Sequence, residues 1–263
     1  MSPRLHFAAA TDIGHHRHEN QDLWLIRDDQ QLAAVADGMG GLPCGAEAAQ
    51  CAIDSLETQL ARSIPSNLEG WRALLDSLNR DVFTLGLKLS PKLGMGTTFT
   101  VVRAQTGRLE IAHVGDSAVF RLREGTLKQL TREHTVAAEV LEHRAAGLVE
   151  RMPHAAEHML TSCLGLPYLP QKDVIETDLV PGDRLLLCSD GLTKPVEFSA
   201  ICETLSRPES SSAIATELIA LANRAGGPDN ITAIVGFCSP DCAATQQAAS
   251  VVREPGSADL HRN

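Results

Sequence analysis

A recurring pattern in this chain joins an apolar strand to an aspartate that is followed at once by a small residue. The pattern occurs at LAAVA-Asp37-Gly38, EIAHVG-Asp116-Ser117 and LLLCS-Asp190-Gly191, and in mirror image where Asp229-Asn230 precedes ITAIVGF. Each case places a carboxylate at the end of a strand, and small neighbours let backbone or a ligand approach closely. Any fold of this chain must therefore accommodate four acidic strand ends.

Two interpretations of this pattern are open. Asp-Gly after a strand and Pro-Asp-Asn are common turn sequences, so each site by itself fits a turn. Asp37-Gly38, however, leads into a Gly-rich loop and a helical pattern rather than into a returning strand. If the four carboxylates converge, they cannot all be ionised close together without a cation. Because oxygen-only ligation favours Mg²⁺ or Mn²⁺ over zinc, the pattern predicts a site for these ions.

Arg17 stands in a polar loop shortly before Gln21 and Asp22. A guanidinium can hold a phosphate through two parallel hydrogen bonds, and an arginine beside an acidic metal site is what a phosphoryl hydrolase requires. By itself Arg17 fits an exposed loop residue equally well. Its role therefore depends on where the aspartates lie.

The apolar periodicity indicates the fold class. It predicts strands at 5–11, 22–27, 31–36, 97–104, 108–114, 118–124, 174–180, 184–189 and 230–237, and helices at 46–62, 67–88, 197–205 and 210–224. This order is not a regular βαβα alternation, so we expect antiparallel sheets with helices packed outside, an α+β layer protein. No linker divides the chain, which predicts one domain. Residues 239–263 are polar and lack periodicity, which predicts a disordered tail.

The composition excludes several classes of function. The formal net charge is −10, and phosphate contacts need lysine and arginine, so we expect no general binding to nucleic acid or anionic membrane. No apolar run approaches the ~18 residues of a membrane span, and the N-terminus has no signal-peptide pattern. The seven cysteines form no CxxC, which favours a reduced, cytoplasmic protein without disulfides or zinc.

Six segments in order resemble the signature motifs of the protein phosphatase 2C family, in its compact bacterial form. They are Arg17-x-x-Asn20-Gln21-Asp22, ADGMGG (36–41), GMGTTFTVV (94–102), HVGDS (113–117), LLCSDGLT (186–193) and GPDNITAIV (227–235). The resemblance implies an α-β-β-α four-layer sandwich, with two central, mostly antiparallel sheets flanked by helices. It also implies a catalytic domain over 1–238 with a mobile flap at about 131–165.

The resemblance implies a set of metal ligands. Asp37 is expected to bridge two ions, and Gly38 to offer its carbonyl oxygen to the second ion. Asp190 and Asp229 are expected to bind the first ion. Asp116 resembles the family residue that, together with Asp190, holds a weaker third ion. The expected cofactors are therefore two Mn²⁺ or Mg²⁺ ions with a weaker third.

The same resemblance implies catalytic roles around the ions. Arg17 is expected to clamp the phosphate and Asp22 to orient the attacking water, with Gln21 and Asn230 as hydrogen-bonding neighbours. Eukaryotic members often carry histidine where Met39 stands. Methionine cannot donate a proton, so the leaving oxygen is expected to take its proton from water.

The predicted function is hydrolysis of phosphoserine and phosphothreonine in proteins by water that two metal ions activate. The enzyme is expected to be a monomer that opposes a serine/threonine kinase. One alternative is a catalytically silent relative that acts as a sensor or scaffold, against which the intact Arg17, Asp37, Asp190 and Asp229 argue. The other is a hydrolase of small phosphate esters or nucleotides, which the acidic charge and the aromatic content of only 3% disfavour.

Overall fold

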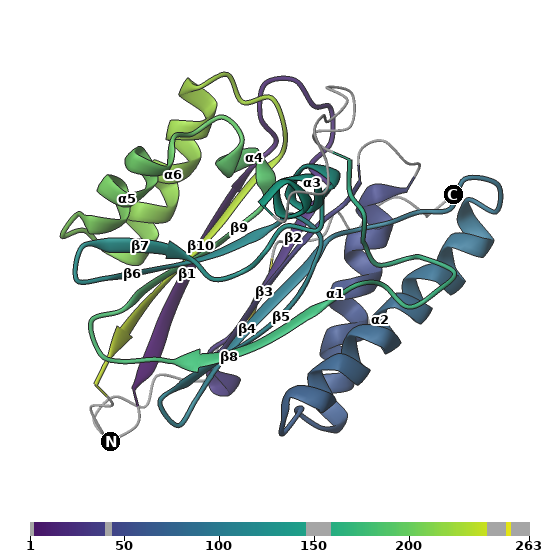
Figure 1. Ribbon diagram of the computed structural model, residues 1–263, viewed down its shortest axis with the longest axis horizontal. Helices are drawn as coiled ribbons and strands as arrows, with labels where there is room; N and C mark the ends of the chain where they lie inside the picture. Colours follow the sequence, from purple (N-terminus) through teal and green to yellow (C-terminus); the bar gives the residue numbers. More distant parts are fainter. Residues whose placement is uncertain (1–2, 40–43, 146–158, 241–250, 254–263) are drawn as a thin grey trace, which may run out of the picture.

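Two antiparallel sheets stack face to face at the centre of the computed structural model, which describes residues 3–39, 44–145, 159–240 and 251–253 (Figure 1). The five-stranded sheet has the order β1 (Arg4–Asp12), β10 (Ile231–Ser239), β9 (Arg184–Cys188), β6 (Ala118–Arg123) and β7 (Thr126–Gln129). The six-stranded sheet has the order β11 (Val251–Arg253), β2 (Asp22–Arg27), β3 (Leu32–Asp37), β4 (Phe99–Gln105), β5 (Arg108–Val114) and β8 (Asp173–Asp178). Every neighbouring pair of strands is antiparallel.

Helices cover the outer face of each sheet. The long helices α1 (Gly45–Arg62) and α2 (Leu68–Leu89) lie on the six-stranded sheet, and α4 (Asp190–Thr193), α5 (Phe198–Ser206) and α6 (Ser211–Arg224) lie on the five-stranded one (Figure 1). A single turn of 3-10 helix, Asp28–Gln30, connects β2 to β3. The predicted α-β-β-α sandwich is therefore confirmed.

Three apolar layers hold the sandwich together, one between the sheets and one under each set of helices. The run from Leu185 to Leu187 shows why the strand at 184–189 reads as continuously apolar. Leu185 and Leu187 point into the layer between the sheets, whereas Leu186 points towards the helices. All three side chains are fully buried, because a strand covered on both faces has no solvent side.

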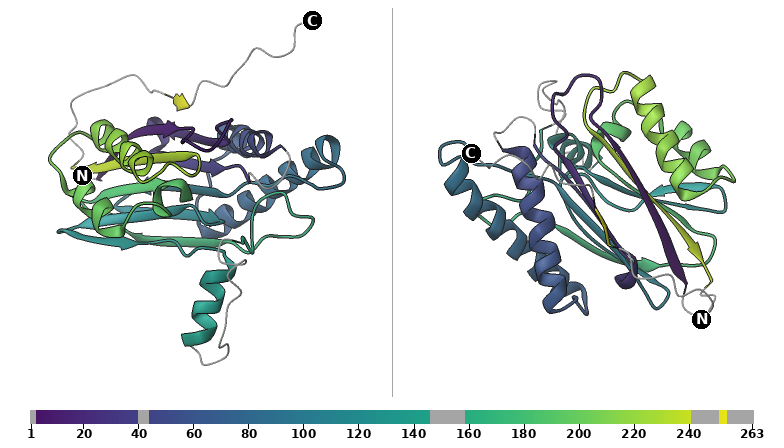
Figure 2. Two further views of the ribbon diagram at one scale, coloured as in Figure 1. Left: turned by 90° about the horizontal axis from the view of Figure 1, so that it is seen from above. Right: turned by 180° about the vertical axis from the view of Figure 1, so that it is seen from behind.

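The segment predicted as a flap contains a helix that stands away from the layers. This helix, α3 (Val136–Ala145), projects from the body of the molecule (Figure 2, left). No residue of α3 is buried. Residues 146–158 of the predicted flap lie outside the described residues.

Three segments differ from the sequence prediction. The region 97–130 holds a fourth strand, β7, which pairs with β6 across a turn at Glu124 and Gly125, both with positive φ. β7 has the sequence TLKQ, which holds one apolar residue and shows no apolar–polar alternation. Asp190–Thr193 forms the short helix α4. Within the predicted disordered tail, Val251–Arg253 pairs with β2, and most of the remaining tail lies outside the described residues.

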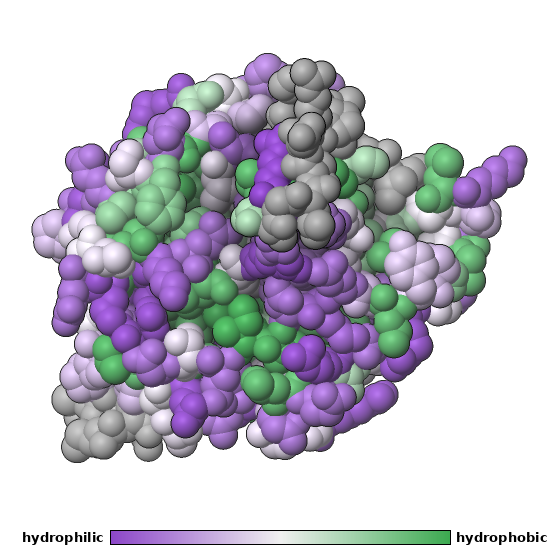
Figure 3. Space-filling view, in the orientation of Figure 1, coloured by the Kyte–Doolittle hydropathy of each residue, from purple (hydrophilic) through white to green (hydrophobic). Residues whose placement is uncertain are grey.

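Hydrophilic residues cover most of the face seen in Figure 3, and hydrophobic residues lie among them in smaller patches. Among the described residues, no helix combines the length and the apolar character that crossing a membrane demands.

Candidate active site

The ends of several strands bring five aspartates together. Asp22 and Asp37 are paired residues of β2 and β3, Asp116 follows β5, Asp190 begins α4 directly after β9, and Asp229 precedes β10. The carboxyl of Asp37 is close enough to the other four that the charge of each raises its pKa. The aspartates that the sequence singled out, which are up to 207 positions apart, therefore form one cluster.

Burial and repulsion from neighbouring carboxylates disfavour the charged forms of Asp22, Asp37 and Asp116. Burial, followed by repulsion from the neighbouring aspartates, raises the pKa of Asp37 well above its usual value. Burial raises the pKa of Asp22 to about 7, although a hydrogen bond from the Ser189 hydroxyl opposes this shift. The pKa of Asp116 also rises to about 7, first through burial and then through the charge of Asp190.

The backbone at Asp37 and Gly38 is fixed by the neighbouring strand. The amide of Asp37 donates to the Thr98 hydroxyl at 3.1 Å, and this hydroxyl shares a hydrogen bond of 2.8 Å with Ser117. A Cβ atom on Gly38 would lie 2.3 Å from the carbonyl oxygen of Gly45, so no side chain fits there. The small residue after Asp37 is thus required by the close approach of α1.

Arg17 reaches the cluster from the loop between β1 and β2. Its Nη2 lies 2.8 Å from Oδ2 of Asp229, and the Arg17 side chain is 38% exposed. The guanidinium therefore lies at the rim of the acidic cluster, where it is open to a ligand.

Asn230 holds the Arg17 loop against the start of β10. Its Oδ1 accepts a hydrogen bond of 2.9 Å from the amide of Gln21, and its Nδ2 donates to the carbonyls of Ile13 and Glu19, each at 2.9 Å. The side chain of Gln21 donates to Glu19. Asn230, which directly follows Asp229, thus joins both sides of the Arg17 loop to the start of β10.

Lys194, which no sequence motif indicated, has its ammonium within the cluster. Its Nζ forms an ion pair with Asp190 and lies 3.8 Å from Oδ2 of Asp116. Lys194 follows Asp190 by four positions, the spacing at which side chains meet on a helix. The four-residue spacing between Asp190 and Lys194 could therefore have predicted their contact, but only if the helix α4 had been expected, and it has only four residues.

The donor set fits hard divalent cations. The clustered ligands are carboxylate oxygens, which Mg²⁺ and Mn²⁺ prefer. Oδ1 of Asp22 is buried and has no hydrogen-bond partner among the described residues, as expected of an oxygen that faces a water or a cation. In the described part of the chain, no three acidic, histidine or cysteine side chains are arranged as the ligands of one metal ion. Two of the carboxylates, those of Asp229 and Asp190, instead form ion pairs with Arg17 and Lys194.

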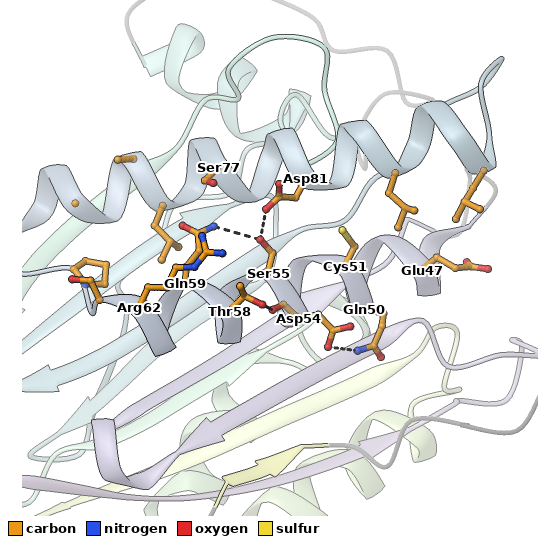
Figure 4. Close-up of a pocket in the computed structure, with 17 residues that line it drawn as sticks. Glu47, Gln50, Cys51, Asp54, Ser55, Thr58, Gln59, Arg62, Ser77 and Asp81 are labelled. Atoms are coloured by element: carbon orange, nitrogen blue, oxygen red, sulfur yellow. Dashed lines mark hydrogen bonds between the residues drawn. The ribbon is translucent and has the colours of Figure 1, made fainter.

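A separate groove of about 1000 Å³ lies between α1 and α2. Figure 4 shows the two helices facing each other across it, with the Ser55 hydroxyl of α1 bonded to Asp81 of α2. The lining residues include none of the predicted site residues. The groove is therefore not part of the acidic cluster.

We expect the metal-free protein to lose stability as the pH rises from 6 to 8. A carboxyl whose pKa is 3.8 in the unfolded chain and about 7 in the folded protein, as for Asp22 and Asp116, favours folding fully below pH 3.8. That contribution is lost as the pH rises through 7, by roughly 1 kcal/mol per carboxyl between pH 6 and 8. Urea unfolding in EDTA at both pH values measures the difference. Equal stability at both would contradict the strained acidic cluster, and saturating Mn²⁺ should remove the dependence.

Comparison with known proteins decides the family. The sequence profile of the protein phosphatase 2C family matches residues 14–235. The chain belongs to this family. This phosphatase is 32% identical over 239 residues to the serine/threonine phosphatase stp of Listeria welshimeri, an alignment that covers 88% of this chain and 95% of that relative. The predicted resemblance is confirmed, and with it the enzyme class.

Solved structures of phosphatases share the fold. The serine/threonine phosphatase of S. agalactiae matches with a TM-score of 0.79 and 29% identity, over 89% of this chain and 99% of that one. The catalytic domain of the phosphatase PstP, solved in complex with two manganese ions, matches with a TM-score of 0.76 and 34% identity, over 91% of this chain and 100% of that one. Metal dependence is thus a property of the family to which this phosphatase belongs.

Proposed function

We propose that this phosphatase hydrolyses phosphoserine and phosphothreonine in proteins with the help of two Mn²⁺ or Mg²⁺ ions. The observation that carries the proposal is the convergence of Asp37, Asp190 and Asp229 beside Arg17. Relatives that bear the name serine/threonine phosphatase support the substrate class.

In this proposal Asp37, the carbonyl of Gly38, Asp190 and Asp229 hold the two ions. Bound ions would supply an activated water and neutralise charge on the phosphate. The guanidinium of Arg17, at the open rim of the cluster, would hold two phosphate oxygens through parallel hydrogen bonds. These contacts would orient the phosphorus towards the buried carboxylates.

Asp22 is suited to orient the attacking water. The Ser189 hydroxyl donates to its Oδ2 at 2.7 Å, while Oδ1 has no partner among the described residues. Oδ1 is therefore the atom that would accept a hydrogen bond from the water and hold its proton. The pKa of about 7 belongs to the metal-free protein; bound cations would lower it and keep Oδ1 as a hydrogen-bond acceptor.

Met39 is unable to protonate the leaving oxygen. Its amide donates to the carbonyl of Gly96 at 3.0 Å, and its sulfur would lie 2.8 Å from a Cβ on Gly96, so the side chain packs against this backbone. A thioether carries no proton to donate. The leaving serine or threonine oxygen would therefore take its proton from water.

The expected result is Mn²⁺-dependent hydrolysis of phosphoserine and phosphothreonine peptides that EDTA abolishes. p-Nitrophenyl phosphate serves as a general substrate, and nucleotides serve as the competing class. No hydrolysis of any of these in Mn²⁺ would favour the silent relative. Faster turnover of nucleotides than of phosphopeptides would favour the hydrolase of small esters.

Several finer features belong to the same proposal. We expect a serine/threonine kinase to supply the phosphorylated substrates, because hydrolysis of these esters reverses its reaction. A catalytic domain over 1–238 with a flap at 131–165, and a monomeric cytoplasmic enzyme, stay predictions from the sequence. The weaker third ion expected between Asp116 and Asp190 would have to compete with the ammonium of Lys194.

A further inference from the structure

Lys194 is held next to the carboxylates of Asp116 and Asp190. Its ammonium forms an ion pair with Asp190 and lies 3.8 Å from Oδ2 of Asp116. The side chains of Asp116 and Asp190 are only 7% and 13% exposed, whereas that of Lys194 is 37% exposed. The lysine therefore reaches from the surface into the acidic cluster and ends between these two carboxylates.

We propose that Lys194 is a fixed cation that takes the place of a third metal ion between Asp116 and Asp190, so that this phosphatase binds two ions rather than three. The inference depends on the proposed function, because it assumes that the neighbouring carboxylates bind metal. It concerns a residue for which the family motifs gave no role.

The backbone that carries Lys194 is fixed in place beside Asp190. The Lys194 amide donates to the carbonyl of Asp190 at 2.9 Å, which closes one turn of helix. A Cβ on Gly191 would lie 2.0 Å from the carbonyl oxygen of Asn230, so α4 packs directly on the start of β10. Leu192 is fully buried beneath this turn. Because α4 is anchored in this way, Lys194 is kept one turn from Asp190.

Charge makes the ammonium and a third dication mutually exclusive. Like charges about 4 Å apart repel each other even in water, and more strongly near a protein surface of lower effective dielectric. A third ion would have to displace the ammonium from Asp190 before it could bind. The ammonium is part of the same chain, so it is present beside the two carboxylates at every metal concentration. A metal ion that binds these carboxylates only weakly from solution does not displace it.

The test is a titration of metal-stripped protein with Mn²⁺, followed by calorimetry and by the loss of the free Mn²⁺ signal in electron paramagnetic resonance. The unaltered protein should bind two ions. Lys194→Met keeps an apolar chain of similar length without the charge. It should bind three ions at Mn²⁺ concentrations where the unaltered protein binds two, which corresponds to a gain of roughly tenfold or more in affinity at the third site. Lys194→Gln should behave in the same way, which guards against a folding defect of one variant.

Two further variants make the result specific. Lys172→Met removes a lysine that pairs with Asp76, outside the cluster, and should leave the stoichiometry at two. Lys194→Met combined with Asp116→Asn should lose the third ion again, because the carboxylate that would bind it is gone.

Three results would overturn the inference. They are three ions on the unaltered protein, an unchanged two ions on both Lys194 variants, and a third ion that survives Asp116→Asn. Absence of any Mn²⁺ binding to all of these proteins would overturn the proposed function and the inference with it, whereas each of the first three results leaves the proposed metal-dependent phosphatase activity intact.

Discussion

Replacement of Asp37 by asparagine is expected to lower phosphopeptide hydrolysis in Mn²⁺ by about three orders of magnitude or more. Asp37 is the carboxylate on which all four other aspartates of the cluster act, so it occupies the centre of the proposed metal site. Asparagine keeps the size of the side chain and removes its charge. Steady-state rates on a phosphothreonine peptide, measured over a range of Mn²⁺ concentrations, test the effect.

The same variant should make the metal-free protein more stable. Burial and the neighbouring acids raise the pKa of Asp37 well above its usual value, so ionising this carboxyl in the folded protein costs free energy. The folded state is penalised above the usual carboxyl pKa, and a neutral amide removes that penalty. In EDTA at pH 8, Asp37→Asn should therefore raise the midpoint of urea unfolding while activity is lost.

The matched control is Asp29→Asn, since Asp29 lies in the 3-10 turn after β2 and pairs with Arg27 on the surface. It should leave the rate of phosphopeptide hydrolysis unchanged. It should also change the free energy of unfolding of the metal-free protein by no more than about 0.5 kcal/mol. Near-normal turnover by Asp37→Asn would remove the basis of the metal site. A loss of metal-free stability would show that Asp37 is not strained by its neighbours.

The fold was largely predictable because its strands and helices carry strong local patterns. The helices expected at 46–62 and 67–88 are observed at Gly45–Arg62 and Leu68–Leu89, since apolar residues recur along each at helical spacing. The strand β7 was missed because four residues at a sheet edge carry little pattern. β11 was missed because its pairing with β2 joins residues more than 220 positions apart.

The site is a different case, because its residues meet through contacts that no local pattern encodes. Arg17 and Asp229 touch across 212 positions, and periodicity says nothing about which strand ends become neighbours. Resemblance to a family supplied the expectation of convergence. It gave no indication of Lys194, whose position depends on the four-residue helix α4. The family resemblance therefore predicted which aspartates lie together, and the structure adds that Lys194 lies among them.

Asn230→Ala is expected to lower the free energy of unfolding by about 3 kcal/mol, because it leaves buried backbone groups without partners. The side chain accepts from the amide of Gln21 and donates to the carbonyls of Ile13 and Glu19, and the residue is only 5% exposed. Urea unfolding measures this loss. Asn230→Asp should not restore the stability, since a carboxylate oxygen would face the two carbonyl oxygens that Nδ2 now contacts.

The same change should impair catalysis beyond its effect on stability, because these hydrogen bonds fix the loop that carries Arg17. With the loop released, the guanidinium would no longer be held at the rim of the cluster, and kcat/KM for a phosphopeptide should fall by about a hundredfold. Most of the loss should appear as a higher KM, since Arg17 is proposed to bind the phosphate.

Asn79→Ala separates the two effects. Asn79 is similarly buried and makes four comparable hydrogen bonds, but to the backbone of residues 165–168 rather than to the Arg17 loop. It should cost a similar free energy of unfolding and leave kcat/KM within about threefold at a temperature where both variants are folded. An equal fall in kcat/KM for both variants would mean that Asn230 acts only through stability. A fall for Asn230→Ala alone would identify it as the residue that positions the phosphate-binding arginine.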